Sequence, residues 1–467
     1  MSSVSEAIDR YFMISERGSS IRVEVRGGII TFLSMAYILA VNPSIISYAT
    51  GGLFQQLVAA TALAACVSCI LMGLYAKFPI ALAPGMGVSA FISFVIVDGM
   101  GFTYYQALLA VFISGLAFLA LTFTGFREKI LESMPDIIKV SICAGIGFFI
   151  VVIGLFNAGI IEHAGSSALQ LGQIAQPGVF LGLLCVVLTL IFWFKNSWMA
   201  VIVGLVITVV IGLLGGAFLG WDTVINGNQL VPGVGTAAFS GAVNIPDFGL
   251  FGTVFTEITE IPVLMWPAFV ACILSLIVVD VFDTAGTLIG LSQEAGLSDE
   301  DGNMTDIGKP LTVDAFASLF GSVAGVSTVT SFIESSTGIA VGAKTGLMAV
   351  TVGVLFFVAM FFAPVLSVIT PACTVGALFL VGLVMVTRMK RICWDDPVNI
   401  ATAFVTIFLM GLSGSVTDGI ALGTLTYLLG MLATQRYGQV SLTMKIIGFV
   451  FLAYFALSDL IIPLLSN

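Results

Sequence analysis

Charged residues are scarce in this sequence. Only 9% of its 467 residues are Asp, Glu, Lys or Arg, whereas 59% are hydrophobic, and the mean hydropathy is +1.14. A water-soluble protein carries charge on about a quarter of its residues. The shortage of charge therefore excludes a soluble globule. It predicts a polytopic membrane protein whose partner is the lipid bilayer and which binds no nucleic acid.

The sequence has a single histidine, and its cysteines do not suggest disulfide, redox or metal pairs. The one histidine, His163, falls in a predicted outer loop, so proton transfer inside the membrane would depend on carboxylates. Cys66 and Cys69 form a C-x-x-C within an apolar helical run, where helix packing is favoured over a redox or zinc site. The seven cysteines give no disulfide framework, and we expect neither a cofactor nor a metal.

Long apolar runs fill the chain instead. We count about fourteen segments near the 20 residues that span a bilayer, several of them short or broken by glycine and proline. This pattern predicts an all-α fold. No cleavable signal peptide is expected, because the first 26 residues are polar and contain arginine. Residues 397–434 form a glycine-broken double segment, and the apolar run after it is either the last span or an extra or interfacial helix.

The 16 Lys and Arg residues predict the orientation, because positive residues stay on the cytoplasmic side of short loops. They occur in the first 26 residues and then at alternate loops. We therefore expect a multi-pass protein of the plasma or inner membrane with a cytoplasmic N-terminus. The acidic stretch SQEAGLSDEDGNMTD is most simply a solvated cytoplasmic loop.

The two halves of the chain resemble each other in layout. Each has two apolar helices followed by an interrupted segment, FPIALAPGMGVSAFISFVIV in the first half and VSTVTSFIESSTGIAVGAKTG in the second. Aligning Gly73 with Gly321 places Met86 opposite Glu334. Transporters are often built from such inverted repeats, with the ligand site at their interface.

Both interrupted segments are expected to contain extended backbone followed by a half-helix. Proline and glycine break the first segment, whereas STVTS is β-branched and a helix should begin near Glu334. Broken backbone at membrane depth is tolerated where it is buried in protein or lines a polar cavity. We expect both half-helix N-termini to offer free N–H groups to a polar ligand.

Acidic residues within apolar helices are the candidate functional side chains. A charge near the bilayer centre costs at least about 2.5 kcal/mol, so such residues are functional by default. Asp283 and Glu334 are favoured as functional over structural carboxylates, whereas the two interpretations are nearly balanced for Asp280, three residues before Asp283. Asp314 and Asp418 lie nearer predicted helix ends, where a capping or loop role is at least as reasonable.

Four stretches carry a resemblance to a known family. They are RGSSIRVEVRGGIITFLSMAYILAVNPSI, CILMGLYAKFPIALAPGMGVSAF, FDTAGTLIGLSQEAGL and GVSTVTSFIESSTGIAVGAKTGL. Their order and spacing, from about residue 11 to beyond residue 380, resemble the AzgA-like branch of the nucleobase/ascorbate permeases, which carry hypoxanthine, guanine and adenine.

The resemblance implies about fourteen spans in two inverted repeats of seven, arranged as a core domain that carries substrate and a gate domain. It also implies that a homodimer would form through the gate domain. The implied divisions are 1–26, a cytoplasmic segment; 27–125 and 263–364, the two parts of the core domain; and 126–262 and 365–467, the two parts of the gate domain.

The resemblance also implies a substrate site. The helix-8 carboxylate and the helix-10 glutamate of the family fall on Asp283 and Glu334. The first broken segment contributes backbone at Gly87 and a polar side chain at Ser89, where many relatives have Asn. Related uracil permeases have histidine where this chain has Thr287.

Further contacts to a ligand are expected from side chains beside these positions. Thr330 precedes the second half-helix. Phe91 and Phe332 could stack on a base, although an ordinary core role is more common at this spacing. Proton coupling is assigned to Asp283, Glu334 and Asp280.

The resulting hypothesis is proton-driven import of guanine, hypoxanthine and possibly adenine by an elevator-type movement of core against gate. Alternatives are another nucleobase, such as uracil or xanthine, or a small anion, because half-helix dipoles attract anions. Two acids facing the cavity argue against an anion. An intramembrane hydrolase is excluded by the lack of a nucleophile–base arrangement or a paired-aspartate signature, so the chain is not expected to be an enzyme.

Overall fold

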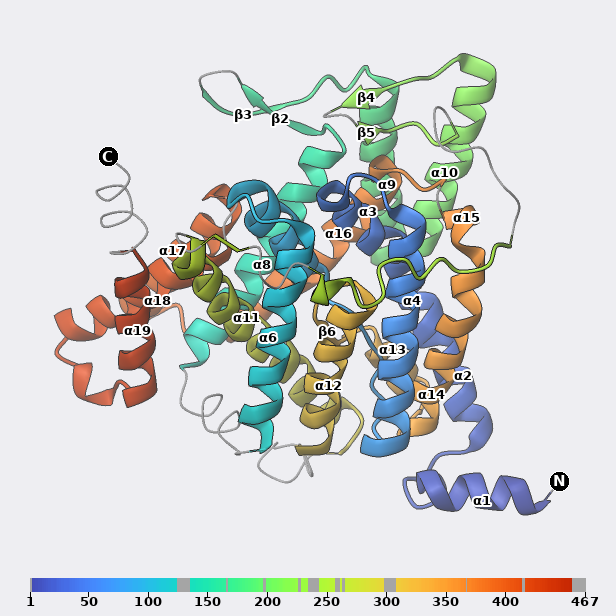
Figure 1. Cartoon of the computed structure of the whole chain (residues 1–467), viewed down its shortest axis with the longest axis horizontal. Coiled ribbons are helices and arrows are strands. Elements are labelled where there is room, and N and C mark those ends of the chain that lie inside the picture. Colours follow the sequence, from blue (N-terminus) through green and yellow to red (C-terminus); the bar gives the residue numbers. More distant parts are fainter. Residues whose placement is uncertain are drawn as a thin grey trace.

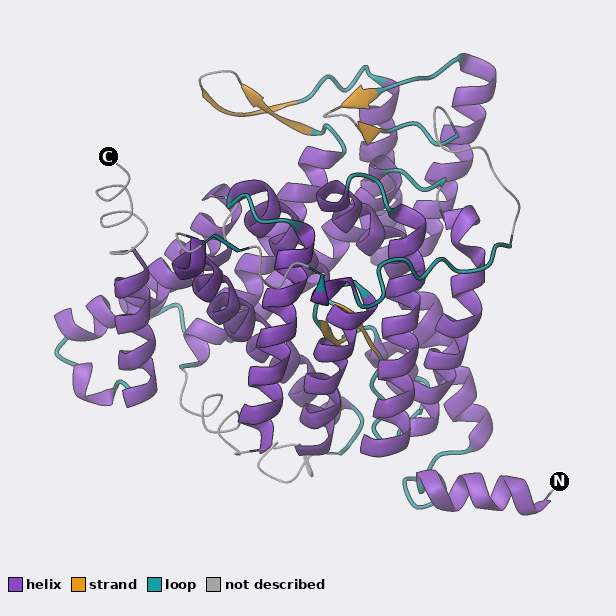
Figure 2. Cartoon of the chain, viewed as in Figure 1, coloured by secondary structure: helices purple, strands orange, loops and turns teal. Residues whose placement is uncertain are grey.

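Apolar helices build nearly all of the fold (Figure 2). The computed structural model describes residues 2–123, 135–164, 167–195, 199–225, 228–233, 243–256, 261–262, 265–297, 308–366, 368–413 and 416–455. Six stretches among these residues are long and apolar enough to cross a membrane. They are Ile21–Thr50, Phe54–Ala76, Tyr104–Thr122, Asp136–Asn157, Pro177–Phe194 and Ala200–Leu219.

The elements run through the chain as follows (Figure 1). In the first half they are α1 (Ser2–Phe12), α2 (Ile21–Met35), α3 (Ile38–Thr50), α4 (Phe54–Leu71), η1 (Met72–Ala76), β1 (Leu82–Pro84), α5 (Met86–Ala90), η2 (Phe91–Gly99), α6 (Tyr104–Phe123), α8 (Asp136–Asn157), β2 (Ile161–Ala164), β3 (Ser167–Leu171), α9 (Pro177–Phe194), α10 (Ala200–Leu219), β4 (Val224–Ile225), β5 (Asn228–Gln229) and η3 (Thr253–Phe255). In the second half they are α11 (Trp266–Glu294), α12 (Gly308–Ala324), β6 (Val329–Ser331), α13 (Ser335–Ala340), α14 (Gly346–Ala359), η5 (Met360–Phe362), α15 (Ala363–Leu366), α16 (Pro371–Val386), η6 (Thr387–Arg391), α17 (Pro397–Ser413), α18 (Val416–Ala433), η7 (Tyr437–Gln439) and α19 (Leu442–Phe455).

The helices pack in two groups. In the first, α2, α3, α4, α6, α11, α12 and α14 surround the short helices α5 and α13; in the second, α8, α9, α10 and α16 pack together and α17, α18 and α19 extend from them. Glycines allow close approach in both. A Cβ at Gly73 would meet the backbone of Gly346, and a Cβ at Gly147 would lie 2.8 Å from the Gly382 carbonyl oxygen. Small residues at such crossings are typical of helix packing in membranes.

Two short strands lie in the middle of the first group. β1 pairs antiparallel with β6, in the register Leu82↔Ser331, Ala83↔Thr330 and Pro84↔Val329. Each strand leads directly into a short helix, β1 into α5 and β6 into α13. The expected extended backbone before a helix near Glu334 is therefore confirmed, and the ladder satisfies backbone groups that would otherwise be unpaired at this depth.

The N-terminal segment ties the two interrupted segments together at one end of the molecule, where α1 lies crosswise to the long helices (Figure 1). Arg17 Nη1 donates to the carbonyl oxygens of Lys77, at 2.8 Å, and Lys344, at 3.0 Å. Glu24 accepts from the Lys344 and Thr345 N–H groups. Burial lowers the pKa of Arg17, and the charge of Glu24 opposes this effect.

The ends of the chain match the sequence pattern in part. α17 and α18 pack against each other, which confirms the double segment predicted at 397–434. The final apolar run begins as α19, and its remainder, residues 456–467, lies outside the described residues. His163 lies in the β2–β3 hairpin, but its side chain is not among those described.

Candidate functional site

A cavity of about 350 Å³ lies where the two groups of helices meet. The first group contributes Ser34 and Tyr37, the start of α5, Thr287 of α11 and the segment from β6 into α13. The second group contributes mainly apolar side chains, which are Cys143, Ile146, Ile150, Trp193, Ala200, Val201, Leu380, Val381, Val384 and Met385. This size and mixture are typical of a small-ligand site, in which a few polar groups orient the ligand within apolar walls.

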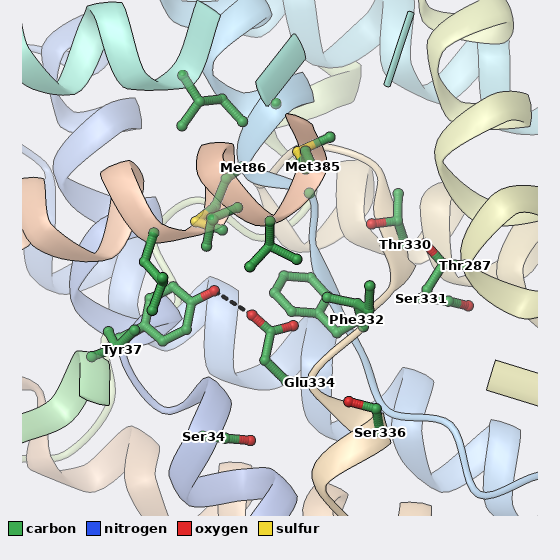
Figure 3. Close-up of a pocket in the computed structure, with 18 of the residues that line it drawn as sticks. Ser34, Tyr37, Met86, Thr287, Thr330, Ser331, Phe332, Glu334, Ser336 and Met385 are labelled. Atoms are coloured by element: carbon green, nitrogen blue, oxygen red, sulfur yellow. Dashed lines mark hydrogen bonds between the residues drawn. The ribbon is translucent and has the colours of Figure 1, made fainter. Parts of the chain in front are cut away.

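Glu334 supplies the carboxylate of the cavity. It occupies the N-cap position of α13, immediately after the β6 ladder, and is half-buried. The Tyr37 hydroxyl donates to its Oε1 at 2.6 Å (Figure 3). Among the described residues that line the cavity, Glu334 is the one with a formal charge. No group of three or more His, Cys, Asp or Glu in the described ranges could hold a metal ion.

The two short helices present different backbone groups to the cavity. At α13, the N–H groups of Ser335, Ser336 and Thr337 already bond to the carbonyls of Phe332, Ile333 and Glu334, at 2.9–3.1 Å. The expectation of free N–H groups at the start of α13 is therefore wrong, because these groups form hydrogen bonds within successive tight turns.

At α5, by contrast, the first intrahelical bond runs from Ser89 N–H to the Gly85 carbonyl. The first-turn N–H groups of Met86, Gly87 and Val88 consequently have no acceptor within the helix. All three residues line the cavity. The start of α5 is therefore the donor side of the cavity, and Glu334 is its acceptor side.

The other acids predicted from sequence lie in different surroundings. Asp283 lies within α11, but its side chain is outside the described part of the structure. Asp280 is fully buried, and its Oδ2 accepts from Ser318 Oγ at 3.2 Å; it does not line the cavity.

Asp314 and Asp418 differ from each other. Asp314 lies inside α12 rather than at its end, is fully buried and accepts from Thr284 Oγ1 at 2.9 Å, so a capping role is wrong for it. It links α12 to α11 instead. Asp418 lies in the first turn of α18, where the helix dipole stabilises a negative charge.

Ser89 and Phe91 point away from the cavity wall. Ser89 Oγ donates to Asn42 Oδ1 at 2.5 Å and lies 2.7 Å from Ser327 Oγ, so its hydroxyl is engaged within the first helix group. Phe91 is fully buried in the hydrophobic core. Neither residue lines the cavity, whereas Gly87, Thr330 and Phe332 do.

Sequence reasoning missed Tyr37, which is the direct partner of the carboxylate. It lies 297 positions from Glu334, between α2 and α3, and is 4% exposed. A phenol within an apolar run is a weak signal, because tyrosine is also a common packing residue. Sequence reasoning also missed Ser34, which lies in the same apolar run. Its hydroxyl lies 3.1 Å from Thr337 Oγ1, next to the start of α13.

The cavity can bind a flat, uncharged ligand with both donors and acceptors on its rim. Glu334 accepts N–H groups, and hydrogen bonds to an ionised group are about twice as strong as neutral ones. The α5 backbone can donate, and Phe332 lies between Glu334 and the hydroxyls of Thr330 and Ser331 in the view of Figure 3.

Residues 22–422 match the family model described as the Permease family. The chain is 38% identical to the guanine/hypoxanthine permease PbuG of Bacillus subtilis, over 95% of this chain and 98% of that protein. It is 34% identical to the adenine permease AdeQ of Escherichia coli, over 98% of both.

Solved structures with a similar fold are more distant in sequence. The transmembrane domain of a cyanobacterium bicarbonate transporter, BicA, is 16% identical and aligns over 88% of this chain and 97% of that one, with a TM-score of 0.56. SLC26A9 is 10% identical over 89% of this chain and 66% of that one, with a TM-score of 0.57. At these identities the similarity concerns the fold alone.

Proposed function

The chain belongs to the Permease family, as its resemblance to the purine permeases predicted, and from this premise we propose that it imports purine nucleobases across the membrane by proton symport. It is a multi-pass transporter and not an enzyme. The named relatives carry guanine, hypoxanthine or adenine, and the cavity described above fits that class of ligand.

The observation that carries the proposal is the Glu334 carboxylate, which faces a cavity with a donor backbone and an aromatic ring. A purine has two apolar faces and a rim of N–H donors and of N or C=O acceptors. Glu334 would accept N–H groups of the base, the start of α5 would donate to its acceptors, and Phe332 would contact a face. Each polar edge of the base thus has a matching group.

Proton coupling is proposed for Glu334 with Asp283, and Asp280 is a further candidate. The part of the cavity wall that the structure describes contains no histidine, lysine or arginine, so carboxylates are the available proton carriers. A carboxylate that binds the base well in one protonation state links the two equilibria. The fully buried Asp280 does not touch the cavity, so its coupling would act through α11 and α12.

Transport by an elevator movement is supported by the position of the cavity between the two groups of helices. In this proposal residues 27–125 and 263–364 form the core domain, and residues 126–262 and 365–467 form the gate domain. A Cβ at Gly87 would lie 2.8 Å from Ile146 Cγ2, so the groups meet closely beside the cavity. Fourteen spans in two inverted repeats, a gate-mediated dimer, and a plasma or inner membrane location with a cytoplasmic N-terminus belong to the same proposal.

A small anion is the second candidate, because one of the similar folds belongs to a bicarbonate transporter. The start of α5 would favour an anion. The Glu334 carboxylate in the same cavity would repel it, and two like charges are destabilising in a water-poor site. The purine is therefore favoured.

The test is uptake of labelled hypoxanthine by cells that express the chain, with and without a protonophore. Adenine, guanine, xanthine, uracil and bicarbonate are added as competitors. We expect uptake that is inhibited by purines and collapses with the protonophore. Uptake of bicarbonate without any purine uptake would overturn the proposal, and purine uptake insensitive to the protonophore would overturn its proton-coupled part.

A further inference from the structure

Three hydroxyl groups in the cavity wall have no hydrogen-bond partner among the described residues. Thr287 of α11 and Thr330 and Ser331 of β6 are 4%, 2% and 4% exposed, and all three line the cavity. Ser331 Oγ is fully buried and has no hydrogen-bond partner among the described residues. Within the same ranges, no side-chain hydrogen bond is found for Thr287 or Thr330 either. Leaving a buried polar group unpaired costs about 1–3 kcal/mol, so such groups need an explanation.

The hydroxyls around Glu334 behave differently. Ser34 and Thr337 contact each other at 3.1 Å, and Thr337 Oγ1 also donates to the Glu334 carbonyl oxygen at 2.7 Å. Ser335 Oγ accepts from Ala81 N–H at 2.9 Å and donates to the Phe332 carbonyl oxygen. These side chains stabilise the turn into α13. Thr287, Thr330 and Ser331 belong to the other part of the wall.

The unpaired hydroxyls also lie apart from the carboxylate. In Figure 3, Thr287, Thr330 and Ser331 gather on one side of Phe332, and Glu334 and Tyr37 lie on the other. We infer that Thr287, Thr330 and Ser331 form a second polar subsite, which binds the carbonyl or amino substituent on the rim of the base while Glu334 binds a ring N–H. This inference rests on the proposed function and specifies how its site recognises the substrate class.

The chemistry of a hydroxyl group decides the selectivity of this subsite. A threonine or serine hydroxyl donates one hydrogen bond and also accepts, whereas a carboxylate can only accept. The subsite can therefore donate to the C6 carbonyl of hypoxanthine or accept from the C6 amino group of adenine by rotation of the same O–H. A site built from fixed donors or fixed acceptors would reject one of the two bases strongly, because a buried group would remain unpaired. The expected substrate class therefore includes both 6-oxo and 6-amino purines.

The experiment removes a hydroxyl from the protein by substitution and removes the C6 substituent from the base by use of unsubstituted purine. Inhibition constants against labelled hypoxanthine uptake are measured for hypoxanthine, adenine and unsubstituted purine in the wild type and in Thr287→Val, Thr330→Val and Ser331→Ala. Valine keeps the shape of threonine without its hydroxyl. Inhibition constants do not depend on the amount of transporter in the membrane. Thr402→Val is the matched control, because Thr402 of α17 also has a buried, unpaired hydroxyl but does not line the cavity.

We expect the wild type to bind hypoxanthine and adenine within about 10-fold of each other and both more tightly than purine. At least one of the two threonine variants should raise the constants for hypoxanthine and adenine about 5- to 10-fold and change that for purine less than about 2-fold. The Thr402 variant should match the wild type.

Two results would overturn the inference while leaving purine transport intact. One is an equal rise for all three bases in the cavity variants, which would indicate a general packing role. The other is no change in any constant. A wild type that neither takes up nor is inhibited by any purine would instead refute the proposed function itself.

Discussion

The two interrupted segments begin alike and end differently. Each passes through one strand of the β1–β6 ladder and then turns into a short helix beside the cavity. At α5 the chain is glycine-rich and uncharged, and its first-turn N–H groups have no acceptor among the described residues. At α13 the turn uses those N–H groups, and the Glu334 side chain faces the cavity instead. Similar backbone thus supplies donors on one side and an acceptor on the other, as a ligand with both kinds of group requires.

The largest effect is expected from removing the acceptor. Glu334→Gln keeps the shape of the side chain but replaces a carboxylate oxygen with an NH₂ group that cannot accept. We expect uptake of labelled hypoxanthine to fall at least about 100-fold, because charge-assisted hydrogen bonds and proton binding are both lost. The control is Glu6→Gln, an exposed glutamate of α1. Near-normal proton-driven uptake by the Glu334 variant would contradict the acceptor role.

A smaller effect is expected on the donor side. In Gly87→Ala the new Cβ would lie 2.8 Å from Ile146 Cγ2, so the Ile146 side chain or the contact between α5 and α8 must shift. Overpacking of this kind costs about 1–3 kcal/mol. We expect uptake to fall about 10-fold with the protein still present in the membrane. Gly438→Ala, where a Cβ would meet nothing within 4 Å, is the matched control. Unchanged uptake in the Gly87 variant would show that this close approach is not required.

Tyr37→Phe tests how the acceptor is positioned. The variant removes the hydroxyl that donates to Glu334 Oε1 and retains the ring. A hydrogen bond to a charged group contributes about 1.5–3 kcal/mol, part of which water can replace in an open cavity. We expect KM for hypoxanthine to rise about 3- to 10-fold with a smaller change in maximal rate. Tyr48→Phe is the control, because Tyr48 is 45% exposed and does not line the cavity. Equal KM values for the two variants would remove Tyr37 from the site.

The smallest effect on transport is expected from replacing Arg17, which links the two interrupted segments by hydrogen bonds. Arg17→Gln removes the guanidinium that bonds to the carbonyls of Lys77 and Lys344. The loss should lower the thermal unfolding midpoint by about 2 °C or more and change KM less than about 2-fold, because Arg17 does not line the cavity. Arg10→Gln, an exposed arginine, is the control. A large change in KM without a change in stability would mean that the N-terminal segment acts on the cavity directly.

Patterns local in sequence predicted the fold and part of the site. β-branched residues before Glu334, and proline and glycine before Met86, indicated the two interruptions and the helix starts, and the structure has strands and short helices at these places. Glu334 stood out because a carboxylate is rare within apolar helices. Both signals come from residues close together in the chain.

Contacts between distant residues could not be predicted in this way. The pairing of Tyr37 with Glu334, the rotation of Ser89 toward Asn42 and the burial of Asp314 inside α12 each depend on how separate helices pack. The turn that consumes the N–H groups of α13 was also missed, because the sequence does not distinguish an open helix start from one closed by successive turns.

The most direct test of base recognition by Glu334 is equilibrium binding of labelled hypoxanthine to the purified protein, because it separates recognition from movement. We predict saturable binding to the wild type, displaced by adenine and guanine but not by bicarbonate, and at least about 100-fold weaker binding to Glu334→Gln in a protein that remains folded. Binding of hypoxanthine to the Glu334 variant within a few-fold of wild type would contradict the claim that this carboxylate holds the base.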